Sequence, residues 1–222
     1  MTTDLWCAPH IHLAAVNEDV ILLDLDGDRY DCLLDAARWL VPGDQGRIQA
    51  LNPEAADALV SAGIATPVPL STLRRPLLRP RREVAPSSHP PQGEVLRAFF
   101  TQASATMLFQ RKSLLELVRL APSGAIQAAH PLARLTKSVA PPDVAVLTSA
   151  ARLARPWIPF EGECLQRSFQ LGRYLAFRGV ATDWVFGVRT WPFSAHCWLQ
   201  AGDLVVGDRL ERVRRYTPIL AV

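Results

Sequence analysis

Apolar and polar residues in the first part of the chain follow a strand pattern and then a helix pattern. Three β-rich runs come first, HIHLAAV, DVILLDL and RYDCL, and the DGD sequence at 26–28 between the last two favours a tight hairpin turn. Two helical runs follow, DAARWLV and NPEAADALVSAG, and the second has Asn52 as its N-cap, Pro53 in its first turn and Gly63 at its end. Three strands followed by two or three helices are typical of a winged helix-turn-helix domain.

The later part of the chain opens with helices and ends with strands. Apolar residues recur every three or four positions in EVLRAFFTQASATMLF, which predicts a helix with a core-facing stripe of Leu96, Phe99, Phe100, Ala103 and Met107. The same spacing after Gly162 predicts a helix that starts at Cys164 and is ended by Gly179 as a C-cap. The runs TDWVFGVR, SAHCWLQ and LVVGD then have strand character, with Gly202 in the turn between the last two.

Charge is distributed unevenly and marks a boundary. Residues 1–72 contain 11 Asp or Glu and 3 Arg, residues 73–90 contain 5 Arg and 1 Glu among several Pro and Ser, and residues 91–222 carry 16 basic and 9 acidic groups. We therefore predict two modules, 1–72 and 91–222, joined by a linker at 73–90. The negative charge of the first module has the wrong sign for a phosphate backbone, so no nucleic-acid partner is expected.

Several protein classes are excluded by features that the sequence lacks. No apolar run reaches about 18 residues, so no membrane span is expected, and the start lacks the basic and apolar regions of a signal peptide, which predicts a cytoplasmic protein. The four cysteines have no disulfide-framework spacing, so reduced thiols are expected. No second ligand cluster follows Cys7, His10 and His12, so both histidines are interpreted as surface or rim residues, and no metal or cofactor is expected.

Cys164 is a candidate nucleophile because it lies at the predicted start of a helix. The unpaired amides and the positive end of the helix dipole there stabilise a thiolate and lower its pKa. Its base would be His196, in the strand run SAHCWLQ. Cys197 follows His196 directly and is expected to point to the other face of the strand, as buried packing.

The turn at Gly202 decides which residue lies opposite His196. A three-residue loop centred on Gly202 sets His196 opposite Asp208, whose carboxylate would accept the Nδ1 proton and leave Nε2 for Cys164. A two-residue Gly202-Asp203 turn is also allowed, and it would set Asp208 opposite Cys197. The alternative interpretation of His196 is a buried histidine beside an incidental aspartate.

The segments CLQRSFQLGRYLAFRGV, VFGVR, PFSAHCWLQ and VVGD closely resemble the leader peptidases of lasso-peptide biosynthesis, the transglutaminase-like cysteine proteases called B proteins. The first module resembles the precursor-recognition domain that many of these proteins carry at their N-terminus. The resemblance implies an α+β chain, with a winged helix-turn-helix-like peptide-recognition domain before a transglutaminase-like or papain-like cysteine protease domain. It also implies that Cys164, His196 and Asp208 are the catalytic residues.

The resemblance further implies the substrate and the partners. The leader of a ribosomally made precursor would bind as a strand beside the helix at 53–62, and the peptide-binding residues would be Arg29, Tyr30, Asp31, Cys32, Leu33, Leu59 and Val60. The protease would hydrolyse the leader–core bond and hand the core to an asparagine-synthetase-like cyclase that closes a macrolactam. Two alternatives remain open: acyl transfer to an amine, as in transglutaminase-like or arylamine acetyltransferase-like enzymes, and a peptide-binding chaperone without catalysis.

Overall fold

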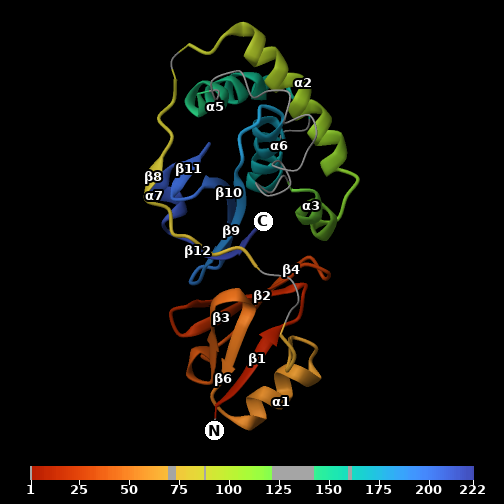
Figure 1. The fold of residues 1–222 in the computed structure, drawn as a ribbon, viewed down its shortest axis with the longest axis vertical. Coiled ribbons are helices and arrows are strands. Elements are labelled where there is room, and N and C mark those ends of the chain that lie inside the picture. The colour runs from red at the N-terminus through yellow and green to blue at the C-terminus, as the bar shows by residue number, and fades with distance from the viewer. Residues whose placement is uncertain (1, 70–73, 88, 122–142, 160–161) are drawn as a thin grey trace. The chain divides into compact units, whose positions relative to one another are not determined.

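The chain forms two compact units, for which the computed structural model describes residues 2–69, 74–87, 89–121, 143–159 and 162–222 (Figure 1). The first unit contains Met1–Leu77, Phe186–Ala195 and Arg215–Ala221, and the second contains Leu78–Val185, His196–Arg214 and Val222. This division differs from the one read from the sequence because two late segments group with the N-terminal residues. Contacts between residues so far apart leave no local signal in the sequence.

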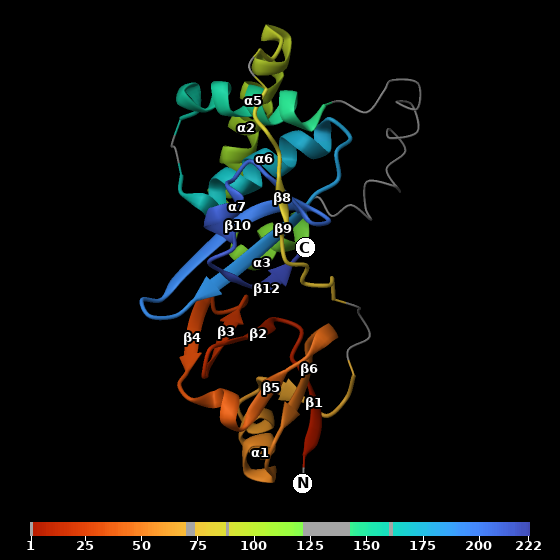
Figure 2. The ribbon, with the colours of Figure 1, turned by 90° about the vertical axis from the view of Figure 1, so that its left-hand side faces the viewer.

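Two antiparallel sheets make up most of the first unit. One has the order β5-β6-β1-β7 and consists of β1 (Thr3–Cys7), β5 (Leu40–Pro42), β6 (Arg47–Ala50) and β7 (Ala65–Thr66). The other has the order β2-β3-β4 and consists of β2 (Ile11–Val16), β3 (Asp19–Asp24) and β4 (Arg29–Leu33). Figure 2 shows β4 at the edge of this smaller sheet.

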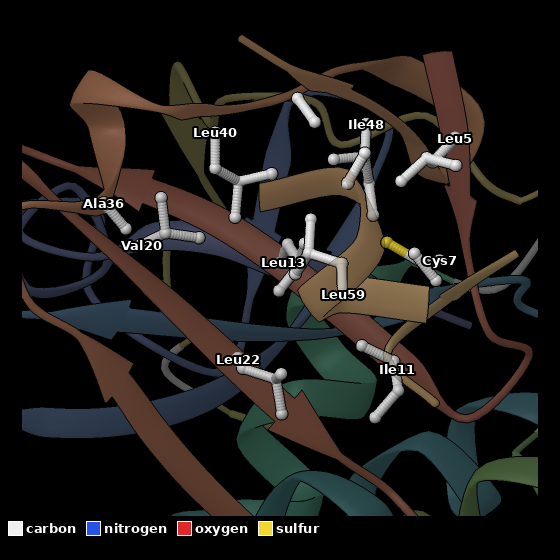
Figure 3. Packing of buried hydrophobic residues seen from close by; sticks show 13 residues of the cluster. Leu5, Cys7, Ile11, Leu13, Val20, Leu22, Ala36, Leu40, Ile48 and Leu59 are labelled. Carbon is white, nitrogen blue, oxygen red and sulfur yellow. The ribbon is translucent and has the colours of Figure 1, made fainter. Parts of the chain in front are cut away.

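The helix α1 (Pro53–Ser61) packs against the four-stranded sheet, on β1, β6 and β7. Asn52 caps it as the sequence predicts, because its side-chain oxygen accepts the backbone N–H of Ala55 at 2.7 Å. Leu59 of this helix belongs to one apolar core with Leu13 of β2 and Ile48 of β6 (Figure 3). Both sheets and the helix therefore contribute side chains to one core, and β3 is buried along its whole length.

The winged helix-turn-helix expectation is not confirmed. The run DAARWLV forms a single 3-10 turn, Ala36–Arg38, and the chain then continues as β5. Leu40 is fully buried and pairs with Ala50 of β6, and Pro42 offers no N–H for a longer helix. In the described part of the first unit, α1 is therefore the only α-helix.

The prediction that His12 lies at the surface or rim is wrong. His12 is buried in β2, and its Nδ1 lies 3.1 Å from Nη1 of Arg74, whose guanidinium also donates to the carbonyls of Ala8 and Ile11. Burial and the charge of Arg74 lower the pKa of His12 to about 3, so the ring is neutral. His10 lies nearer the surface, with its Nδ1 3.7 Å from Asp26.

The second unit is rich in helices. Those in the described residues are α2 (Gln92–Phe109), α3 (Leu114–Leu120), α5 (Val144–Ala154), the 3-10 turn η4 (Arg155–Trp157), α6 (Cys164–Phe177) and α7 (Leu210–Val213). The helix α2 packs against both α5 and α6, as Figure 1 shows. No helix in the described ranges is long and apolar enough to span a membrane.

A five-stranded sheet has the order β12-β9-β10-β11-β8. Its strands are β8 (Arg82–Glu83), β9 (Asp183–Arg189), β10 (Ser194–Ala201), β11 (Leu204–Val206) and β12 (Thr217–Ala221). The strand β8 comes from the predicted linker and pairs in parallel with β11, where Arg82 forms an ion pair with Asp203 at 2.6 Å. Part of the predicted linker is therefore a structured edge strand.

The apolar stripe predicted to face the core on α2 is largely exposed. Leu96, Phe100 and Met107 are each more than half exposed, whereas the buried face carries Glu94, Ala98, Gln102, Ala105 and Thr106. Small residues on that face allow α5 and α6 to approach closely. The buried polar groups have partners, since Gln170 Nε2 donates to Thr106 Oγ1 at 2.7 Å and Gln102 Nε2 donates to a carbonyl of α5.

Candidate active site

Cys164 is the first residue of α6, where the sequence predicts it. Its N-cap, Glu163, makes no capping hydrogen bond with its side chain, so the free amides of the first turn and the helix dipole favour a negative charge there. Hydrogen bonds from the Cys197 thiol, from His196 and from the backbone N–H of Cys197 lower the pKa of Cys164 to about 4, against the opposing effect of burial. Cys164 is therefore a thiolate at neutral pH.

His196 projects from β10, and only 9% of its side chain is exposed. Its Nε2 lies 2.6 Å from Oδ2 of Asp208, and its ring stacks on that of buried Trp198, with the centroids 6.1 Å apart. Burial by itself would lower the pKa of His196. Hydrogen bonds to Asp208 and Cys164 outweigh burial and raise this pKa to about 9, so the ring is an imidazolium at neutral pH.

Asp208 is held by its own neighbours as well as by His196. Its Oδ1 accepts the backbone N–H of Arg209 at 2.7 Å, and Arg212 lies 3.8 Å away. Burial would raise the pKa of Asp208, but the hydrogen bonds from His196 and Arg209 hold it below the usual value. The structure thus brings together the three candidate residues, with an ionised carboxylate against the imidazolium.

The register predicted from a three-residue loop is wrong. The strands β10 and β11 pair Ala201 with Leu204 and Leu199 with Val206, which requires a two-residue turn at Gly202 and Asp203. Gly202 has φ of 61°, and glycine at the first central position is typical of a type II′ hairpin turn. The order Gly-Asp was therefore a signal in the sequence for the shorter turn.

Asp208 nevertheless reaches His196 because the pairing of β11 with β10 stops before Asp208. The strand β11 ends at Val206, and Gly207 follows with φ of 78°, a left-handed conformation that favours glycine. A Cβ at position 207 would also collide with the side chain of Leu171. If β11 continued in the same register, Asp208 would lie opposite Cys197. The turn at Gly207 changes the direction of the chain, so Asp208 lies against His196 instead.

The two ring nitrogens of His196 have roles opposite to those predicted. Asp208 lies against Nε2, not Nδ1, which leaves Nδ1 for the sulfur of Cys164. Either arrangement gives a nucleophile, a base and a group that orients the base. Neighbouring side chains thus set the ring orientation, which the order of residues does not specify.

Part of the chain is similar to known proteins. A family described as the Transglutaminase-like superfamily matches residues 107–221, which is more than half of the chain and includes the three candidate residues. The chain belongs to the transglutaminase-like superfamily. A stretch of 49 residues is also 41% identical to the microcin J25-processing protein McjB of Escherichia coli. These two matches support the resemblance to the lasso-peptide B proteins that was inferred from the sequence.

The match to McjB is short. It covers 22% of this chain and 24% of McjB, so the aligned stretch spans about a quarter of that relative's length. No solved structure matches the chain significantly. The superfamily assignment therefore rests on the matched family, and the likeness to McjB concerns one segment.

The sequence did not predict a group of residues, Cys197, Ser168 and Trp184, that form hydrogen bonds around Cys164. The prediction that Cys197 points to the other face of the strand, away from Cys164, is wrong. Its thiol donates a hydrogen bond to the sulfur of Cys164. Behind it, Ser168 Oγ lies 3.5 Å from Cys197 Sγ, donates to the carbonyl of Cys164 at 2.7 Å and accepts Trp184 Nε1 at 2.7 Å. The four-residue spacing of Cys164 and Ser168 on one helix face was the available signal.

Replacing Cys197 by alanine should raise the pKa of Cys164, because the thiol of Cys197 is the strongest donor to the thiolate. We expect an upward shift of about one pH unit or more in the midpoint for alkylation of Cys164 by iodoacetamide, followed by mass spectrometry of its peptide. Cys197→Ser keeps a hydroxyl donor and should shift the midpoint less. Equal midpoints in the wild type and Cys197→Ala would contradict this role.

The predicted peptide-binding residues lie on separate elements of the first unit. Arg29–Leu33 form β4, at the edge of the smaller sheet, whereas α1 packs on the four-stranded sheet. Leu59 is only 3% exposed and belongs to the core, so it is not available to a peptide, and Val60 is exposed. The described residues contain no group of three His, Cys, Asp or Glu side chains that could hold a metal ion.

Proposed function

We propose that this protein is a lasso-peptide B protein, a leader peptidase that hydrolyses the leader–core bond of a ribosomally made precursor. The observation that carries the proposal is the contact of the Cys164 thiolate with the His196 imidazolium, which Asp208 orients through Nε2. Membership of the transglutaminase-like superfamily and the partial similarity to a microcin J25-processing protein support the same chemistry and the same class of substrate.

The reaction would proceed through an acyl-enzyme. The Cys164 thiolate attacks the carbonyl carbon of the leader–core bond, and the backbone N–H of Cys164 is the candidate donor to the developing oxyanion. His196 gives its Nδ1 proton to the amine of the core peptide as the C–N bond breaks. A water molecule then attacks the thioester, returns a proton to His196, and releases the leader as a carboxylic acid.

The leader would be held by the first unit as an added strand on β4. An edge strand offers unpaired backbone groups, and strand addition is a common way to bind an extended peptide. Holding the leader raises the effective concentration of the leader–core bond, so the catalytic residues need little affinity of their own. The freed core would pass to an asparagine-synthetase-like cyclase that closes the macrolactam.

The test is to incubate the purified protein with a leader-bearing precursor peptide, with and without the cyclase, and to measure masses over time. We expect two fragments whose summed mass exceeds that of the precursor by one water, cut at the leader boundary. A leader joined to an added amine would identify an acyl transferase instead. Tight binding without a cut in any mixture would contradict a peptidase and leave a peptide carrier.

A further inference from the structure

Two exposed aromatic residues lie in a short segment of the first unit. Trp191 is 73% exposed and Phe193 is 50% exposed, and both belong to the connection between β9 and β10. This connection, within Phe186–Ala195, groups with the N-terminal residues although the sequence places it in the second module. Large aromatic side chains left open to solvent and held in fixed positions are typical of binding surfaces.

Trp191 is fixed at the far end of β4. Its Nε1 donates to Oδ2 of Asp19 at 2.9 Å, and Oδ1 of the same carboxylate accepts the backbone N–H of Asp35 at 3.0 Å. Asp35 follows shortly after β4 ends at Leu33. The indole is therefore tied by its N–H beside the C-terminal end of β4, while most of its ring is exposed.

Phe193 is fixed near the beginning of the same strand. Its ring centroid lies 5.7 Å from that of Tyr30, with an angle of 54° between the planes. Tyr30 lies opposite Leu23 of β3 and therefore shares its sheet face. Asp19 and Leu23 alternate along β3, so the contacts of Trp191 and Phe193 lie on one face of the smaller sheet, near opposite ends of β4.

The ends of the segment are also held. Asn17 Nδ2 donates to Thr190 Oγ1 at 3.2 Å, and the hydroxyls of Ser194 and Tyr216 are 3.3 Å apart. Anchors before Trp191 and after Phe193 limit the rearrangement that a bound peptide would require. A surface prepared in this way loses little conformational entropy on binding.

We propose that Trp191 and Phe193 form an aromatic wall of the leader site, against which a peptide added to β4 packs apolar side chains at alternate positions. This inference rests on the proposed function and identifies residues that the recognition domain alone does not supply. Successive side chains of an added strand point to opposite faces, so residues two apart would meet the wall. An extended peptide with apolar residues at such positions is the partner that fits.

Charge further defines that peptide. The stretch from Glu18 to Asp35, which contains β3 and β4, has seven Asp or Glu residues and one arginine. The arginine, Arg29, is already paired with Asp24 and Asp31. A leader with Lys or Arg next to its alternating apolar residues is therefore complementary to this edge, and its binding should weaken as salt concentration rises.

The experiment titrates a fluorescein-labelled synthetic leader, without core residues, into the full-length protein and measures fluorescence anisotropy. The leader is that of the precursor peptide used in the cleavage experiment. We expect Trp191→Ala and Phe193→Ala each to weaken binding about tenfold or more, and Phe193→Tyr to retain affinity because it keeps the ring. Phe100→Ala is the matched control, since Phe100 is also exposed, at 67%, but lies on α2.

A second set of peptides tests direct contact. Leaders whose alternate apolar residues are changed to serine should bind the wild type weakly, and Phe193→Ala should cause little further loss with them. Unchanged affinity in Trp191→Ala and Phe193→Ala would overturn the aromatic wall while leaving the peptidase proposal intact, provided that the wild type cleaves the precursor. A wild type that neither binds nor cleaves would overturn both.

Discussion

Replacing Cys164 by alanine should abolish cleavage of the leader–core bond and leave affinity for the leader unchanged. The thiolate forms the acyl bond, so its loss should lower the cleavage rate by more than about a thousandfold. The leader is expected to bind β4, in the first unit, and Cys164 belongs to the second. Mass spectrometry of the products and anisotropy of a labelled leader measure the two properties on the same sample.

Cys164→Ser is the matched variant for this experiment. It keeps a side chain of similar size at the start of α6, but its hydroxyl stays protonated at neutral pH, so it should be as inactive as Cys164→Ala. Loss of leader affinity in either variant would contradict the separation of binding and catalysis between the two units. Residual cleavage by both would contradict Cys164 as the nucleophile.

Replacing His196 by alanine should reduce cleavage about a thousandfold and make Cys164 less acidic. The pKa of Cys164 is about 4 partly because His196 donates a hydrogen bond and carries a positive charge, so its loss should move the alkylation midpoint towards the ordinary thiol value. Iodoacetamide alkylation between pH 3 and 9, with the Cys164 peptide followed by mass spectrometry, measures this shift. The midpoint of the wild type should lie near pH 4. His10→Ala, a histidine of the first unit, is the control.

The same pair determines how cleavage depends on pH. Cys164 has a lowered pKa, so the thiolate is lost as pH falls through about 4, and His196 has a raised pKa, so the imidazolium is lost as pH rises through about 9. We expect a broad plateau of activity between these values in the wild type. An alkylation midpoint that is identical in the wild type and His196→Ala would contradict the ion pair.

Local features of the sequence were sufficient to place Cys164, the candidate nucleophile, at the start of a helix. Gly162, the helical spacing that follows it and the C-cap at Gly179 placed Cys164 at a helix start, and α6 begins there. Helix ends depend on capping and periodicity within a few residues, so they can be read from the sequence. The same holds for Asn52 at the start of α1.

Long-range packing decided what local patterns could not. The stripe of Leu96, Phe100 and Met107 had the right spacing for a core face, but small and hydrogen-bonded residues on the other face of α2 allowed the neighbouring helices to approach. Burial depends on what packs against a helix, and periodicity does not identify that partner. The grouping of Phe186–Ala195 with the N-terminal strands is of the same kind.

The sequence by itself determined the candidate catalytic residues, the helix that starts at Cys164 and the strand that carries His196. Only the tertiary structure decided how they meet, through a two-residue turn, the left-handed Gly207 and the orientation of His196 with Nε2 towards Asp208. The physical reason is that side chains alternate along a strand with a period of two, so one residue of register or one glycine turn reverses which groups share a face.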